Sequence, residues 1–338
     1  MSAPPTLAAQ SEGAAAAGPP VVQLNAADPH AQAEAHRAEL RAMVREHGAV
    51  LVRGLRIADA EDARLACSAI GVEPVTEREG FAPRSVLGDR IYSSLEWPPD
   101  QPMCMHHELS YADTVPSLLI VMCLVAPAGG GETALADATE VLAALPAELT
   151  EEFARTGWLL ERNYHATLGM TWQQAFGTED PQGVERYCLA HGVDVEWRAD
   201  GGLRTRQRRD AIVRHPRTGA RCWFNQIAFC NRWTLDPDVR AYLTMEFGDR
   251  GLPFDTFYGD GRPLTPGTVE TINAAYDAHT RRVPWRAGDI MIIDNIRTAH
   301  NREPYRGDRR MAVILADPIR PVPGGVGGRP PTGDRTGR

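Results

Sequence analysis

Runs of consecutive apolar residues alternate along this chain with amphipathic stretches, and the two patterns predict different elements. The strongest run covers residues 118–125, and its eight apolar, partly β-branched residues predict a buried central strand. Shorter runs predict strands at 49–54, 89–94, 132–137, 159–164, 193–197, 211–214, 289–294 and 310–315. Helical spacing and composition predict helices at 31–46, 59–70, 139–145, 236–247 and 269–281. Asp59 is the expected N-cap of the second helix, and Gly48 is expected to end the first.

The order of these elements predicts an α+β, mostly β protein. Strands near both ends with a mixed segment between them favour a double-stranded β-helix, or jelly roll, with flanking helices and a long insertion. We therefore expect a single domain over residues 21–319, with the insertion at about 158–266. Residues 1–20 are rich in Ala, Pro and Gly, residues 320–338 in Gly, Pro and Arg, and both are predicted to be disordered tails.

Composition narrows the class of partner. A formal net charge of −8 and a pI near 5.7 argue against a nucleic-acid or membrane-surface protein, and the basic run 204–209 is interpreted as a solvated or substrate-facing strand. Six cysteines without Cys-x-x-Cys spacing predict free thiols in a reducing compartment. Because the chain has neither an apolar stretch long enough to span a membrane nor a signal-peptide pattern, a cytoplasmic location is expected.

The candidate chemistry lies in His106-His107-Glu108 and in His300. In an extended strand, residues two apart point to the same face, so His106 and Glu108 would project together while His107 turns away. Two histidines and one carboxylate that leave coordination positions open are the ligand set of non-haem Fe(II) oxygenases. Other interpretations stay open at this point: a His-x-Glu pair occurs by chance, His107 could be the ligand, and His300 could be a structural histidine.

Several further segments, in a fixed order, resemble a known family. The chain resembles the taurine-dioxygenase-like (TauD/TfdA) branch of the Fe(II)/2-oxoglutarate oxygenases, and within it the syringomycin-pathway aspartyl hydroxylase-like group. The resemblance extends from about Val50 to Ala316. It is carried by residues 97–102, 106–112, 130–137, 163–165, 172–173, 176–178, 203–207, 223–226, 288–295, 300 and 302–309.

The resemblance implies roles for individual residues. His106, Glu108 and His300 match the iron ligands, and no catalytic residue is expected beyond the metal centre. Thr133 matches the threonine that hydrogen-bonds 2-oxoglutarate. Arg309 matches the arginine that binds the distal carboxylate, a role that suits a planar guanidinium. Arg310 has the opposite parity on a strand, so one of the two arginines should face outward, and Arg309 is preferred.

The chain departs from the group's pattern at two positions. His107 stands where the group often has Asn, and because it points away from the metal we expect no loss of iron. Asn301 follows the second histidine where Gly is common, which predicts a changed backbone there. The narrower group uses Glu as its carboxylate ligand, as here. Related halogenases have Ala or Gly in its place, so the presence of Glu108 disfavours halogenation.

The implied reaction is hydroxylation of an unactivated C–H bond in natural-product biosynthesis, consuming 2-oxoglutarate and O2 and releasing succinate and CO2. The expected substrate is amino-acid-like, free or tethered to a carrier protein. Desaturation, epoxidation or cyclisation by the same iron chemistry remains an alternative, as do a non-catalytic metal-binding barrel and a zinc hydrolase. Candidate substrate-binding residues are Asn225, Arg204, Arg206, Glu96 and Ser110.

Overall fold

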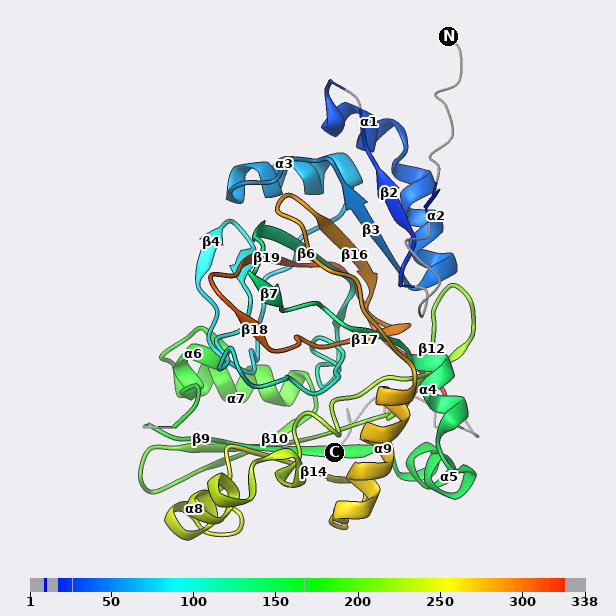
Figure 1. Cartoon of the computed structure of the whole chain (residues 1–338). Coiled ribbons are helices and arrows are strands. Elements are labelled where there is room, and N and C mark those ends of the chain that lie inside the picture. Colours follow the sequence, from blue (N-terminus) through cyan, green and yellow to red (C-terminus); the bar gives the residue numbers. More distant parts are fainter. Residues whose placement is uncertain (1–8, 11–17, 26, 167, 326–338) are drawn as a thin grey trace, which may run out of the picture.

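The computed structural model describes residues 9–10, 18–25, 27–166 and 168–325 (Figure 1). Its centre is an eight-stranded sheet in which β6, the predicted central strand, pairs antiparallel with both β16 and β19. In spatial order the strands are β1 (Ala9–Gln10), β2 (Val21–Gln23), β3 (Ala49–Arg53), β16 (Ile290–Asp294), β6 (Val115–Val125), β19 (Arg310–Ile319), β5 (Ile91–Ser93) and β4 (Val86–Gly88).

The two faces of this sheet belong to different cores. Ile120 and Met122 of β6 pack with the apolar sides of three helices, whereas Leu119 and Val121 point to the opposite side. Residues of β3, β16 and β19 divide in the same alternating way, because successive side chains of a strand face opposite sides. The covering helices, above the sheet in Figure 1, are α1 (Pro29–Ala35), α2 (Arg37–His47) and α3 (Ala60–Ile70).

Short strands lie opposite the second face of the large sheet (Figure 1). Leu135 and Ala299 of these strands join the same core as Leu119 and Val121. The strands form one sheet of β15 (Thr280–Arg281), β8 (Leu135–Asp137) and β17 (Thr298–His300), and a second pair of β18 (Tyr305–Arg306) and β7 (Gly129–Gly130). The chain is thus a mixed α and β protein built on extensive sheets, which agrees with the coarser part of the fold prediction.

The segment from residue 158 to residue 266 forms a separate four-stranded sheet with helices around it. The strands, in the order β10-β11-β9-β14, are Val193–Trp197, Leu203–Arg209, Trp158–Tyr164 and Phe254–Tyr258. The helices of this segment are α6 (Trp172–Phe176), α7 (Pro181–Ala190), η1 (Arg232–Thr234) and α8 (Pro237–Phe247).

The remaining elements are three helices and a three-stranded sheet, two strands of which also belong to the segment 158–266. They are α4 (Ala138–Ala144), α5 (Ala147–Thr156), α9 (Pro266–Ala278), and a sheet of β13 (Arg221–Trp223), β12 (Ile212–Arg214) and β20 (Val322–Pro323). No helix among the described residues is long and apolar enough to cross a membrane.

Most predicted elements are present, and the differences have local causes. The predicted helix 31–46 is two helices, because His36 leaves the helical region (φ −105°, ψ 14°) between α1 and α2. The predicted strand 132–137 starts only at Leu135. The predicted helix 269–281 runs from Pro266 to Ala278 and is followed by β15. Asp59 and Gly48 cap α3 and α2 as expected.

Parts of the two predicted tails belong to sheets. Within residues 1–20, β1 pairs with β2, and within residues 320–338, β20 pairs with β12. A short stretch of each predicted tail therefore pairs its backbone with a neighbouring strand. Residues 1–8, 11–17 and 326–338 lie outside the described residues.

The core assignment makes one prediction about stability. Ile120 is fully buried between β16 and β19, so Ile120→Ala should lower the free energy of unfolding by about 2–5 kcal/mol through lost burial and a residual cavity. Urea denaturation measures this loss. Val86, 74% exposed on β4, provides the control, because Val86→Ala should change stability by less than about 0.5 kcal/mol. Equal losses in the two variants would contradict this packing.

Candidate metal centre

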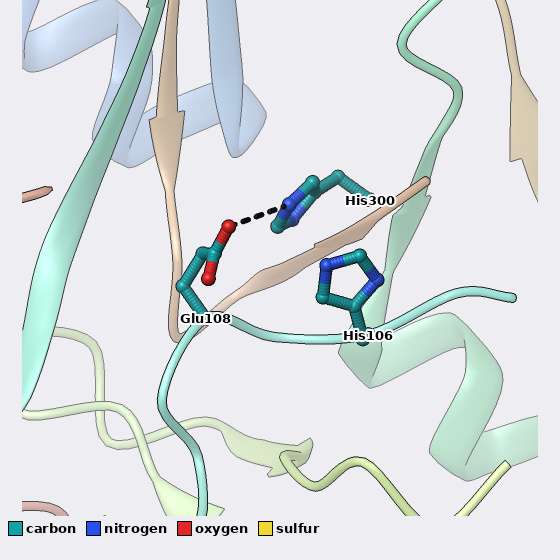
Figure 2. Close-up of side chains that lie close together, drawn as sticks. All are labelled: His106, Glu108 and His300. Carbon is teal, nitrogen blue, oxygen red and sulfur yellow. Dashed lines mark ion pairs between the residues drawn. The ribbon is translucent and has the colours of Figure 1, made fainter. Parts of the chain in front are cut away.

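His106, Glu108 and His300 form a buried group at the inner side of the large sheet (Figure 2). Backbone pairing joins the two histidines, with His106 N–H donating to His300 O (3.0 Å) and His300 N–H to His106 O (2.9 Å). Glu108 Oε1 lies 3.6 Å from His300 Nε2. One possible ligand atom from each residue lies within 4.8 Å of the others, so the three side chains can hold one metal ion together.

The His-x-Glu segment is less regular than the predicted strand. His106 makes an isolated bridge, but Glu108 already begins a turn in which Leu109 has a positive φ of 53°. The alternation of side chains nevertheless holds: the His107 ring nitrogens lie 2.6 Å from Asn295 O and 3.0 Å from Trp223 O. His107 is therefore engaged away from the triad, as expected.

Asn295 fixes the backbone of the carboxylate ligand. Its Oδ1 accepts a hydrogen bond from Glu108 N–H (2.8 Å), and its Nδ2 donates to Glu108 O (3.0 Å) and Pro116 O (2.8 Å). Asn295 is fully buried, and it follows β16 directly. The pairing of β16 with β6 thereby determines where Glu108 lies.

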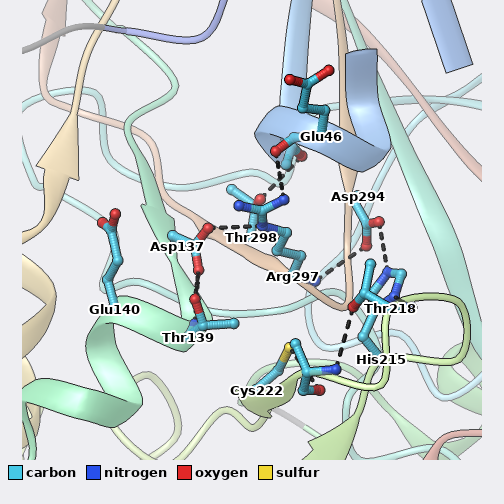
Figure 3. A network of polar contacts seen from close by, with 12 residues as sticks. Glu46, Asp137, Thr139, Glu140, His215, Thr218, Cys222, Asp294, Arg297 and Thr298 are labelled. Carbon is cyan, nitrogen blue, oxygen red and sulfur yellow. Dashed lines mark hydrogen bonds and ion pairs between the residues drawn. The ribbon is translucent and has the colours of Figure 1, made fainter. Parts of the chain in front are cut away.

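The loop after β16 is held by a polar network (Figure 3). Asp294 accepts hydrogen bonds from His215 Nε2 (2.8 Å) and from Arg297 N–H (3.1 Å). The Arg297 side chain then donates to Asp137 (2.8 Å) and to the carbonyl of Glu46 (2.7 Å). These contacts connect β16, β8 and α2, so the segment that leads to His300 is anchored on several elements.

Electrostatics leave the triad ready to bind a cation. Burial, with a smaller effect of His300, lowers the pKa of His106 to about 3, so this imidazole is neutral. Burial alone would raise the pKa of Glu108, but Arg84 and the two histidines outweigh it and hold that pKa well below its usual value. Neutral imidazoles and an ionised carboxylate are the forms that bind metals. The donor set matches that of Fe(II) oxygenases.

A cavity adjoins the triad, and both predicted 2-oxoglutarate residues line it. Thr133 is buried there, and Arg309 reaches in from the residue just before β19, with its Nε donating to Gly131 O (3.1 Å). Burial, and to a lesser extent Arg302, lowers the pKa of Arg309 to about 10. Within the described ranges, no carboxylate forms an ion pair with Arg309. Arg310, by contrast, is 67% exposed beside Asp308.

Asn301 accepts a hydrogen bond from Ala134 N–H through Oδ1 (3.2 Å), and its own N–H donates to Ala134 O (3.1 Å). The residue that departs from the family pattern therefore adds a side-chain hydrogen bond between the segments that carry His300 and Thr133. This contact fixes the local backbone at the edge of the cavity.

A second cavity lies next to the first. The segments 81–84 and 94–97 line both cavities, with Arg84, Ser94 and Leu95 on the side of the triad. Phe229 stacks on His106 at 4.6 Å between ring centroids and contacts Phe81 at 4.8 Å. Residues that line the second cavity are mainly apolar and aromatic, and include Phe81, Trp97, Leu168, Met170 and Phe254.

The structure separates the candidate substrate residues into two groups. Glu96 lines the second cavity, and Ser110 is buried two residues after Glu108 with an unpartnered Oγ. Asn225 uses its amide to bond Ala211 O and Ile227 N–H. Arg204 and Arg206 lie on β11, where both pair with Glu161. Glu96 therefore lines a cavity, whereas Ser110, Asn225, Arg204 and Arg206 line neither the metal cavity nor the second cavity.

Arg84 contacts the triad but was not among the site residues that the sequence predicted. Arg84 donates to Glu108 Oε1 at 2.7 Å, and its side chain is only 4% exposed. It comes from an irregular segment before β4, with no motif or periodicity around it. Nothing in the sequence pattern distinguishes it from the other arginines.

Comparison with known proteins agrees with this geometry. The family described as taurine catabolism dioxygenase TauD, TfdA family, matches residues 9–315. The dapdiamide synthesis protein DdaC of Enterobacter agglomerans is 34% identical over 276 residues, covering 82% of this chain and 84% of that protein. A clavaminate synthase-like protein of Arabidopsis thaliana is 28% identical over 286 residues, covering 82% and 83%.

The fold is also similar to that of a solved structure, a putative α-ketoglutarate-dependent taurine dioxygenase from Burkholderia xenovorans. The TM-score is 0.53 at 18% identity, over 94% of this chain and 95% of the other. The chain belongs to the TauD/TfdA family, as its resemblance predicted. It is an Fe(II)/2-oxoglutarate-dependent dioxygenase, and enzymes of this type use Fe(II), 2-oxoglutarate and O2.

The triad makes a prediction that needs no substrate. A metal ion that binds only the folded protein stabilises it, by about 2.7 kcal/mol at a hundred times its dissociation constant. Mn(II) should therefore raise the thermal midpoint of metal-free protein, and His300→Ala should abolish this shift. Scanning calorimetry measures both, with His279→Ala as a control outside the triad. A shift that persists in His300→Ala would contradict the assignment.

Proposed function

We propose that this enzyme hydroxylates an unactivated C–H bond of an amino-acid-like substrate, free or carrier-tethered, in natural-product biosynthesis. The observation that carries the proposal is the cavity between the triad and Arg309, a partly buried arginine without an ion-pair partner in the described part of the chain. The relative named for dapdiamide synthesis supports the biosynthetic context. We further propose that the large sheet and the short strands opposite it are the two walls of a jelly roll.

The residues of the cavity divide the binding of metal and co-substrate between them. His106, Glu108 and His300 would hold Fe(II), which supplies the oxidative chemistry with 2-oxoglutarate and O2. Arg309 would receive the distal carboxylate of 2-oxoglutarate through a charge-assisted hydrogen bond, and Thr133 would add a hydroxyl contact. Apolar residues of β6 and β19 line one side of the cavity.

The charges of the site fit this pair of ligands. Two carboxylates, Glu77 and Glu108, lie near three guanidinium groups, Arg84, Arg302 and Arg309, so positive charge is in excess by one before anything binds. A divalent cation and the dianion of 2-oxoglutarate cancel each other, so binding both adds no further net charge to the site. This matters because an uncompensated buried charge costs several kcal/mol, of the order of 3–5.

The second cavity is the proposed substrate site. Its shared segments place it next to the triad, and its apolar and aromatic lining suits the body of a small molecule. Glu96 supplies a carboxylate for a substrate ammonium group. Residues 162–164, 168–170 and 253–254 complete the lining. We therefore propose that the insertion at about 158–266, within a single domain over residues 21–319, shapes the substrate site.

The co-substrate assignment has a matched pair of variants. Under anaerobic conditions, wild-type protein with Fe(II) and 2-oxoglutarate should show a weak visible charge-transfer band. Arg309→Ala removes a charge-assisted hydrogen bond to 2-oxoglutarate. The 2-oxoglutarate concentration that gives half of the maximal absorbance should therefore rise roughly ten- to hundredfold in this variant. Arg310→Ala removes the same charge from the exposed neighbour and should leave the titration unchanged. No band in iron-loaded wild type would overturn the proposed function.

The substrate class is tested with a panel of amino acids, by measuring succinate release. For the compound that stimulates release, Glu96→Gln should raise KM about tenfold at similar kcat, because the contact is made equally before and during reaction. Glu148→Gln, at an exposed position of α5, serves as the control. The product should gain one oxygen atom. A product that has instead lost hydrogen would assign desaturation or cyclisation.

A further inference from the structure

Three buried charged side chains form a row that ends at the metal-binding carboxylate. Arg84 lies in the middle, with its Nη2 donating to Glu108 Oε1 at 2.7 Å and its Nε 3.3 Å from Glu77 Oε2. The side chains are 4% exposed for Arg84, 8% for Glu108 and 11% for Glu77. Because water and salt do not screen these buried charges, their mutual attraction is stronger than that of an exposed ion pair.

The Glu108 carboxylate depends on Arg84 for its orientation. Asn295 fixes the Glu108 backbone, but a glutamate side chain has several rotatable bonds between its backbone and its carboxylate. Among the described residues, the contact with Arg84 is the hydrogen bond that this carboxylate accepts, because His300 Nε2 is 3.6 Å away. Without Arg84 the carboxylate would have no fixed direction.

The segment that carries Arg84 is itself firmly held. Glu79, with a positive φ of 56° and 2% exposure, directs its carbonyl to Tyr111 Oη (2.8 Å) and Arg162 Nη1 (2.7 Å). Arg162 Nη2 also donates to Gly80 O (2.7 Å), and Tyr187 Oη donates to Glu79 Oε1 (2.8 Å). Arg162 and Tyr187 lie on β9 and α7, so the sheet and helices of residues 158–266 anchor this segment.

We propose that Arg84 is a positioning residue, held by Glu77, that keeps the Glu108 carboxylate directed at the metal. This inference rests on the proposed metal centre and adds a residue that contacts no metal itself. It also gives the segment 158–266 a second role, because that segment anchors the backbone before Arg84. Hydrogen-bonding partners of ligating carboxylates orient the ligand and tune metal affinity.

The decisive variant removes the hydrogen bond that orients the Glu108 carboxylate but leaves the net charge of the site unchanged. Arg84→Gln combined with Glu77→Gln deletes one positive and one negative charge, so electrostatic attraction for a cation is matched to the wild type. The dissociation constant for Mn(II) should rise about tenfold, the lower end of the effect of losing such a partner. Electron paramagnetic resonance of free Mn(II) measures it without any turnover. Arg78→Gln, on the same segment but exposed, should bind Mn(II) like the wild type.

The folding of each variant is measured in parallel, so that unfolding is not mistaken for a misplaced Glu108 carboxylate. The metal-free double variant should keep the wild-type circular dichroism spectrum while its Co(II) d–d spectrum changes, since that spectrum reports ligand arrangement. If the double variant does not fold, Arg84→Lys, which keeps the charge but has different geometry, should show the same weakening. Unchanged Mn(II) affinity in either folded variant overturns the proposal. Failure of wild-type protein to bind Mn(II) would instead overturn the metal centre itself.

Discussion

The reciprocal backbone pairing of His106 with His300 is the interaction on which the rest of the site depends. It brings together two segments far apart in the chain, and each carries one imidazole of the triad. The third ligand is placed through the neighbouring pairing of β16 with β6, because Asn295, directly after β16, holds the backbone of Glu108 by hydrogen bonds. The ligand geometry is thus a consequence of sheet register, and a one-residue slip would turn every inward side chain outward.

The division of the large sheet into two cores explains how the site stays rigid. One set of alternating residues packs under α1, α2 and α3, and the other lines the interior where the triad lies. Because the strands are buried on both faces, they cannot shift without losing apolar contacts on two sides. The polar network from Asp294 through Arg297 to Asp137 extends this rigidity to the loop before His300. A binding site on such elements holds its geometry before any ligand arrives.

Buried charge organises the space around the triad. Arg84 and Arg309 approach the cavity from opposite ends of the sequence, one engaged with carboxylates and the other without an ion-pair partner in the part of the chain that is described. This contrast separates their roles: an engaged arginine can orient a ligand residue, and an arginine without a partner can receive an anion. The segment 158–266 contributes to the metal cavity indirectly, through the hydrogen bond from Arg162 to the Glu79 carbonyl, and it lines the second cavity directly.

The sequence by itself determined most of the elements, and it was enough to propose the ligand set. Apolar runs and caps are local signals, so most strands and helices and the capping roles of Asp59 and Gly48 could be predicted, and residue spacing already put His107 opposite to its neighbours. Tertiary structure alone decided the roles of Arg84 and Asn295, and it placed Asn225, Arg204 and Arg206 in structural contacts away from both cavities. The physical reason is that periodicity tells which way a side chain points, whereas its partner depends on which distant backbone lies opposite.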